Sequence, residues 1–203
     1  MKIMHALILD GFKGEDARRD PVRSALTAEL ESRGATWKWI EVERLQIAPC
    51  RGCFHCWTKT PGICVIDDDA IGVARMIAQC DVMVYVTPVV FGGVSPTLKA
   101  AMDRNICLVQ PFFERVNGEV HHKRRYKRYP SMVAIGIADT DDTEGRTLFE
   151  RLMTRMSINN RSVAYAGVAL PEESLYAKSE SKGAPSLRSV LGSLLTRVEV
   201  VGR

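Results

Sequence analysis

The chain has 203 residues, of which 46% are hydrophobic and 26% are charged, and its formal net charge is +4. This is ordinary globular composition, and so modest a charge does not by itself indicate a nucleic-acid-binding protein. No segment reaches the roughly 20 apolar residues of a membrane span, so no membrane association is expected. The length predicts one domain over residues 1–203. The apolar start lacks a cleavage site, which predicts a cytoplasmic protein whose six cysteines do not form a disulfide framework.

The first half of the chain alternates strand and helix patterns. The apolar run 3–10 predicts a buried strand, and Asp20-Pro21 predicts a helix with Asp20 as its N-cap, ending at Gly34. Residues 36–42 predict a second strand, and residues 47–66 an irregular, cysteine-rich loop. A helix from the acidic run 67–69 to about residue 80 then precedes a third strand over 81–87.

The second half continues the alternation. Ser95-Pro96 predicts another helix start, followed by a strand over 131–138, a helix over about 143–158, a strand over 162–170 and an apolar helical stripe over 187–198. Five strands alternating with five helices predict an α/β three-layer sandwich with a five-stranded parallel sheet. Such folds bind ligands at the carboxyl ends of strands where the strand order reverses, which directs attention to loops 10–20, 87–95 and 139–143.

The loop after the third strand is apolar and contains glycine. Its residues Thr87, Pro88, Val89, Val90, Phe91, Gly92 and Gly93 join a buried strand to a well-capped helix. Such a loop can place backbone groups along the edge of a flat heteroaromatic ring, with glycines permitting close approach. The alternative is a tight strand-to-helix turn with an exposed phenylalanine.

This loop, the segment 98–104 and the cysteine loop 49–64 together resemble the flavodoxin-like family of NAD(P)H-dependent FMN reductases and iron–sulfur flavoproteins. The resemblance covers about residues 1–160. It implies a sheet of strand order 2-1-3-4-5 and an FMN whose ring lies against residues 87–92.

The loop after the first strand departs from the family pattern. The family places a Ser/Thr/Asn-rich phosphate loop there, whereas residues 10–19 of this chain lack hydroxyl donors. Backbone amides, the helix N-terminus and basic side chains could hold a phosphate instead, although Glu15 and Asp16 would oppose it. The residues expected at the cofactor besides the 87–93 loop are Gly11, Lys13, Arg18 and Asp139.

Four cysteines follow one another closely between the second strand and the next helix. Cys50, Cys53, Cys56 and Cys64 have the spacing C-x2-C-x2-C-x7-C, which suits a [4Fe–4S] cluster and resembles the motif of iron–sulfur flavoproteins. A zinc site and a metal-free loop are the alternatives, and a disulfide is disfavoured by the compartment. Cys80 and Cys107 are interpreted as small core residues.

Residues 121–130 combine basic and aromatic side chains. Nucleic-acid binding is one interpretation, but we favour a solvated face before the next strand, or a segment that covers the flavin site and holds a nucleotide phosphate or anionic substrate. His121 and His122 could donate protons there.

The function favoured by these patterns is an FMN-dependent oxidoreductase that takes hydride from NAD(P)H and passes electrons to a small acceptor such as a quinone or flavin. An iron–sulfur flavoprotein electron carrier without its own nicotinamide oxidation is the alternative. A non-enzymatic binding module is disfavoured, because a phospho-receiver would need an acidic residue where Thr87 stands. Small-molecule substrates and a homo-oligomer are expected, with no catalytic residue assigned.

Overall fold

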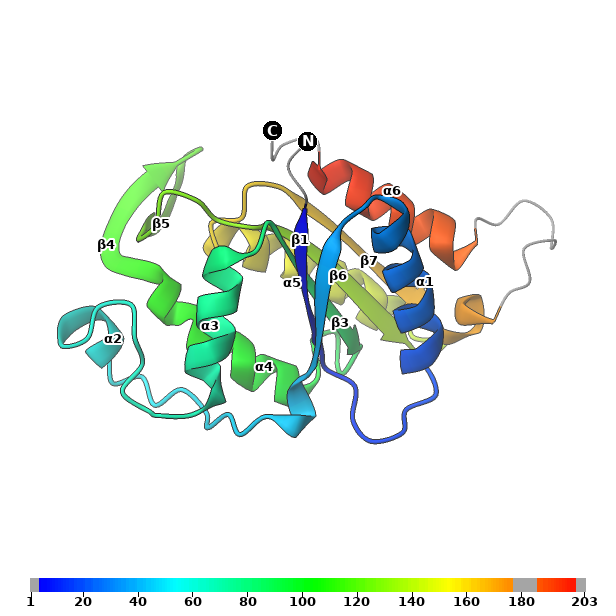
Figure 1. Cartoon of the computed structure of the whole chain (residues 1–203), viewed down its shortest axis with the longest axis horizontal. Helices are drawn as coiled ribbons and strands as arrows, with labels where there is room; N and C mark the ends of the chain where they lie inside the picture. Colours follow the sequence, from blue (N-terminus) through cyan, green and yellow to red (C-terminus); the bar gives the residue numbers. More distant parts are fainter. Residues whose placement is uncertain (1–3, 177–185, 200–203) are drawn as a thin grey trace.

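The computed structural model describes residues 4–176 and 186–199, so the predicted strand start at Ile3 lies outside the described residues. Five parallel strands form one sheet in the order β2-β1-β3-β6-β7 (Figure 1). They are β1 (His5–Asp10), β2 (Thr36–Glu41), β3 (Val82–Pro88), β6 (Ser131–Ala138) and β7 (Tyr165–Pro171). Counting only the strands of this sheet, the order is 2-1-3-4-5, which confirms the flavodoxin-like prediction.

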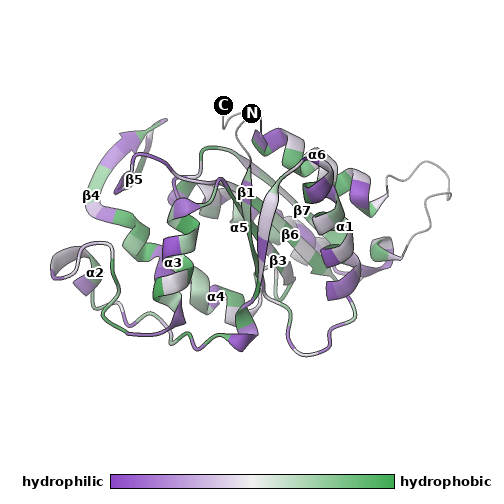
Figure 2. Cartoon of the chain, in the orientation of Figure 1, coloured by the Kyte–Doolittle hydropathy of each residue, from purple (hydrophilic) through white to green (hydrophobic). Residues whose placement is uncertain are grey.

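Helices cover both faces of the sheet. On one face lie α1 (Arg19–Ser32) and α6 (Leu187–Glu199), and on the other α3 (Asp69–Gln79), α4 (Pro96–Asp103) and α5 (Thr143–Asn159). The period of two along a strand explains the two cores: Leu7 of β1 packs with the α3–α5 side, and Ile8 with the α1–α6 side. Every residue of β6, an interior strand of the sheet, is buried, whereas hydrophilic residues mark the outer helices (Figure 2).

Several boundaries differ from the sequence prediction. α1 begins two residues early, at Arg19, so that Asp20 is not the N-cap but a first-turn acid facing the helix dipole. The cysteine-rich loop, predicted to be irregular, contains the one-turn helix α2 (His55–Thr58). Cys80 lies just after α3, half-buried, with its thiol donating to Ile77 O, whereas Cys107 is buried as predicted.

A two-stranded antiparallel sheet was not predicted. β4 (Val109–Val116) and β5 (Glu119–Arg124) form a hairpin outside the main sheet (Figure 1). Its turn residues Asn117 and Gly118 both have positive φ, 50° and 84°, as Asn-Gly hairpin turns require. The basic stretch therefore begins inside a strand rather than in a loop leading to β6.

Three short 3-10 helices complete the described elements: η1 (Val42–Arg44), η2 (Arg104–Leu108) and η3 (Glu172–Leu175). Among the described residues, none of the helices combines the length and the apolar character that a membrane crossing demands.

Candidate functional site

The carboxyl ends of β1, β3 and β6 bring the three predicted loops together. β1 and β6 flank β3 in the sheet, and the amide of Val89 donates to Ile137 O at 2.8 Å. On the β1 side, Arg18 Nη1 lies 3.7 Å from Asp139 Oδ1 of the loop after β6. The predicted site residues of all three loops thus lie along one edge of the sheet.

A tight turn shapes the loop after β3. Val90 and Gly93 exchange backbone hydrogen bonds of 3.0 and 2.9 Å across Phe91 and Gly92. Both central residues have positive φ, 48° and 72°, as in a type I′ turn. The Phe91 side chain is fully exposed, with a relative accessibility of 101%. The turn therefore presents an aromatic ring to solvent at the edge where flavodoxin-like folds bind ligands.

A hydroxyl fixes the loop to the next helix. Thr87 Oγ1 accepts from the amide of Ser95 at 2.9 Å and donates to Pro88 O at 2.9 Å. Ser95 in turn caps α4, its Oγ accepting from the amide of Leu98 at 3.3 Å. The loop thus enters α4 in one defined geometry, which preorganises it for a ligand.

Two glycines predicted to approach a cofactor also lie close to other parts of the chain. A Cβ on Gly11 would lie 2.7 Å from Ser95 Oγ and 2.8 Å from Leu98 Cβ. A Cβ on Gly92 would lie 2.7 Å from Leu148 Cβ of α5. Their small size is therefore explained by packing within the protein.

The basic residues predicted near the phosphate differ in their surroundings. Lys13 is exposed. Arg18 is paired in two hydrogen bonds with Asp16, from Nε to Oδ1 at 2.9 Å and from Nη2 to Oδ2 at 2.8 Å. The Arg18 side chain holds the pKa of Asp16 below its usual value. Arg18 is thus already neutralised by a carboxylate.

The four-cysteine loop contains α2 and lies beside η2. Cys50 and Cys53 are exposed, Cys64 is half-buried and Cys56 is buried. Burial raises the pKa of Cys56, and the charges of Cys64, Cys50 and Cys53 raise it further. Within the parts of the chain that the structure describes, no group of three or more Cys, His, Asp or Glu side chains is arranged as a metal site.

Arg104 closes the base of this loop, and sequence reasoning did not find it. The side chain is buried, and its Nη1 donates to Ala48 O and Asp68 Oδ2, both at 2.7 Å. Its Nη2 donates to Asp68 Oδ1 at 2.9 Å and to Ile66 O at 3.2 Å. One guanidinium therefore ties together both ends of the segment that carries the cysteines. The only available signal was a charged residue directly after a helix that begins at the predicted flavin loop.

A row of rings joins α2 to the hairpin. Phe54 stacks on Trp57 with centroids 5.1 Å apart, Trp57 lies 4.9 Å from His122, and His122 lies 4.6 Å from Phe113. His121 is buried and bonded through Nε2 to Glu119 at 2.9 Å. The basic stretch thus helps to hold the hairpin against the cysteine loop.

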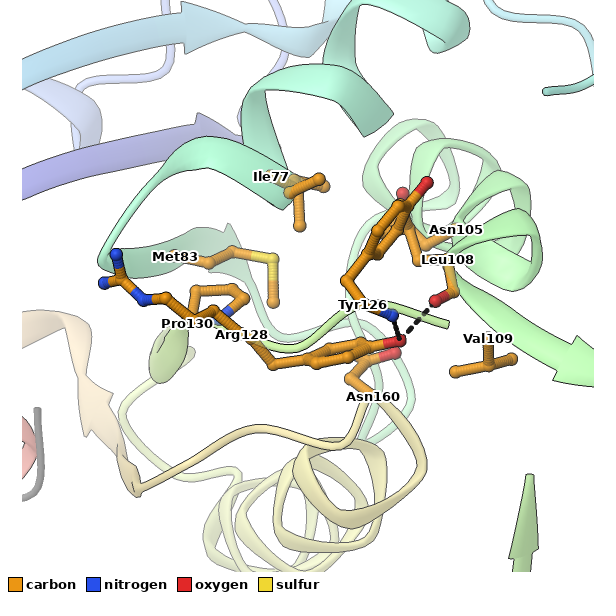
Figure 3. Close-up of a pocket in the computed structure, with 11 residues that line it drawn as sticks. Ile77, Met83, Asn105, Leu108, Val109, Tyr126, Arg128, Pro130 and Asn160 are labelled. Atoms are coloured by element: carbon orange, nitrogen blue, oxygen red, sulfur yellow. Dashed lines mark hydrogen bonds between the residues drawn. The ribbon is translucent and has the colours of Figure 1, made fainter. Parts of the chain in front are cut away.

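Two cavities lie away from the loop after β3. Figure 3 shows the smaller cavity near the start of β3, where Met83, Arg128 and Pro130 line it; its volume is about 20 Å³. A larger cavity of about 360 Å³ lies against α3 and is lined by Cys64, Arg104 and Cys107, among others. The smaller cavity is at the opposite edge of the sheet from the predicted flavin site. The larger one belongs to the region of the cysteine loop.

Comparison with known proteins agrees with this arrangement. Residues 4–126 match the NADPH-dependent FMN reductase family. An iron–sulfur flavoprotein of Archaeoglobus fulgidus is 36% identical over 91 residues, 45% of this chain and 46% of that protein. One from Methanocaldococcus jannaschii is 38% identical over 84 residues, 41% and 42% of the two chains. The matched part spans less than half the length of these curated relatives.

Solved structures show the same fold over nearly the whole chain. An NAD(P)H:quinone oxidoreductase from Methanothermobacter marburgensis superposes with a TM-score of 0.63 at 18% identity, covering 100% of this chain and 96% of that one. An FMN-dependent NADH-azoreductase from Bacillus anthracis, in complex with FMN, gives 0.62 at 13% identity and covers 99% and 100%. With the family match extending over more than half of the sequence, this chain belongs to the NADPH-dependent FMN reductase family.

Proposed function

We propose that this chain is a cytoplasmic NAD(P)H-dependent flavin oxidoreductase, with residues 1–203 acting as one domain and the flavin ring lying against the turn Val90–Gly93. The observation that carries the proposal is this exposed turn, held at the carboxyl edge of the sheet beside the β1–β3 switch in strand order. A bound flavin supplies hydride acceptance from NAD(P)H and electron delivery to a small acceptor such as a quinone or flavin.

The residues of the turn would bind and orient the ring. Thr87 and the Val90–Gly93 hydrogen bonds fix the backbone before any ligand arrives, which lowers the ordering cost of binding. The exposed ring of Phe91 offers an aromatic contact, and Pro88 and Val89 are only half-buried beside it. Asp139 and the loop after β1 would border the same site.

Titration with FMN, followed by quenching of flavin fluorescence, tests the proposal. Saturable quenching at micromolar protein is expected, followed by reduction of the bound flavin on adding NADH or NADPH. Phe91→Ala should weaken FMN binding by about three- to tenfold through loss of one aromatic contact. Phe112→Ala is the matched control, because Phe112 is also exposed but lies on the β4–β5 hairpin. Absence of saturable quenching would contradict the assignment.

The second candidate is an iron–sulfur electron carrier with a [4Fe–4S] cluster on Cys50, Cys53, Cys56 and Cys64. The observation that favours it is the placement of these four cysteines on one loop, where the charges of Cys64, Cys50 and Cys53 raise the pKa of Cys56. Two of them are exposed and so accessible to iron and sulfide. Thiolates are the ligands such clusters use, although the side chains are not gathered into a ligand set here.

Protein prepared without oxygen, with iron and sulfide present, tests the cluster. Iron and acid-labile sulfide should be found in about equal amounts. Cys53→Ala should abolish both and leave the sheet folded by circular dichroism, whereas Cys80→Ala, outside the loop, should change neither. Protein that binds no iron under these conditions would contradict the cluster assignment, and protein that binds zinc instead would show that the loop has a structural role. If the protein holds the cluster and NAD(P)H does not reduce its bound flavin, the electron-carrier function would be favoured.

Light scattering in solution tests the expected homo-oligomer.

A further inference from the structure

The loop after β1 is filled by the protein's own charged side chains. Asp10 is fully buried at the end of β1, and its Oδ1 accepts from the amide of Phe12 at 2.8 Å. Its Oδ2 accepts from Arg19 Nε at 2.8 Å and from Trp39 Nε1 at 3.0 Å. A carboxylate therefore already occupies the end of the strand where a ligand anion would approach.

Four other backbone amides at this loop also have partners within the chain. The amide of Gly14 donates to Glu43 Oε2 at 2.7 Å, and that of Arg18 to Asp16 Oδ1 at 3.0 Å. The amide of Arg19 donates to Asp16 O at 3.0 Å, and that of Gly11 to Val86 O at 2.7 Å. A phosphate cradle works by pointing unpartnered amides at the ligand. Here these four amides donate to carboxylates and carbonyls of the chain instead.

The two arginines of this loop are similarly committed. Arg19 donates to Asp10, to the carbonyls of Phe12 and Gly14, and at 3.0 Å to Glu43 Oε1. Arg18 is paired with Asp16 and lies 3.7 Å from Asp139 and 3.9 Å from Glu172.

The carboxylates around these two arginines outnumber them: Asp10, Asp16, Glu43, Asp139 and Glu172. A phosphate monoester carries about −1.5 to −2 charges at neutral pH and would meet this negative field. The loop thus lacks the net positive charge that favours a bound phosphate dianion, and both of its arginines are already paired with carboxylates.

We propose that this chain holds flavin through the ring alone, so that its ligand class is flavin with or without a 5′-phosphate, riboflavin as well as FMN. The proposal rests on the proposed flavin site at Val90–Gly93 and adds that the loop after β1 gives the phosphate no favourable anchor. The flavin is then an exchangeable ligand rather than one held permanently at both ends.

Parallel titrations with riboflavin and FMN, followed by flavin fluorescence, test this inference. A phosphate held by two or three charge-assisted hydrogen bonds would favour FMN by about a hundredfold or more. We expect the two dissociation constants to differ by less than about tenfold. FMN bound tenfold or more tightly than riboflavin would overturn the inference and leave the proposed function intact. Binding of neither flavin would overturn the proposed function itself, and the inference with it.

Paired variants test the residues responsible. Asp16→Asn releases the Arg18 guanidinium, and Glu43→Gln removes the charge facing the Gly14 amide, both with little change of shape. The double variant should gain a preference for FMN of about tenfold or more, with riboflavin affinity unchanged. Glu31→Gln is the control, because Glu31 is exposed near the other end of α1 and its loss changes net charge in the same direction. A folded double variant without this gain would show that these carboxylates do not set the discrimination and would overturn the assignment.

Discussion

Replacing Arg104 by methionine should destabilise the protein more than any change of an exposed ion pair. The substitution keeps an apolar stem of similar length and removes a guanidinium that makes four hydrogen bonds, to Ala48 O, Ile66 O and both oxygens of Asp68. The Arg104 side chain is 1% exposed and that of Asp68 10%, so water cannot replace the lost partner freely.

The expected loss of stability depends on which polar groups remain without a partner in the variant. Removing one member of a buried ion pair costs about 3–5 kcal/mol. Asp68 retains hydrogen bonds from the amides of Ala48 and Ala70, at 3.0 and 3.1 Å, which compensate part of the loss. The expected loss is therefore about 3 kcal/mol, a large share of the roughly 5–15 kcal/mol by which a typical domain is stable.

Urea unfolding followed by circular dichroism measures this loss. Lys99→Met is the matched control, because Lys99 and Asp103 form an exposed i,i+4 pair one turn away on α4, worth at most about 0.5 kcal/mol. Asp68→Asn in the Arg104→Met background should recover part of the stability by removing the isolated charge. A loss below about 1 kcal/mol in Arg104→Met would refute the view that this guanidinium closes the cysteine loop.

Three further outcomes are expected. Burial raises the pKa of Asp68, but the hydrogen bonds from Arg104 and from two backbone amides outweigh burial and hold this pKa below its usual value of 3.8. The stabilisation that this carboxylate provides is therefore present above pH 3.8 and is lost as the pH falls further. Urea unfolding at pH 5 and pH 3 should therefore show a smaller fall in Asp68→Asn than in the parent, and equal falls would contradict the role. Gly136→Ala should lower the free energy of unfolding by about 1–3 kcal/mol, because the new Cβ would lie 2.8 Å from Cε1 of Phe149 and from Cγ2 of Val89. An unchanged thermal unfolding temperature would contradict this and show that α5 can shift to make room. Burial raises the pKa of Cys107 to about 11, so iodoacetamide should label exposed Cys50 in the metal-free protein well before Cys107, as peptide mass spectrometry would report.

The fold was predictable because its signals are local. Strands β1, β3 and β6 are continuous apolar runs, and Ser95-Pro96 places the start of α4 where the structure has it. Periodicity of burial and helix capping depend on neighbouring residues, so they can be read along the chain. The hairpin also had a local signal, the Asn117-Gly118 turn, but its strands are half-exposed and carry no clear alternation.

The candidate site shows the same difference between features with local sequence signals and features that depend on distant residues. The sequence by itself determined that a glycine-bearing turn follows β3, that four cysteines share one loop, and that the hydroxyl donors of a phosphate loop are missing. Only the tertiary structure decided that Asp10, Arg19 and Glu43 fill that loop, and that Arg104 bonds both Ala48 and Ile66. These partners are distant in sequence, and a charged side chain is buried only where folding brings a matching charge or carbonyl to it. That matching depends on the packing of β1, β2 and α4, which no local pattern specifies.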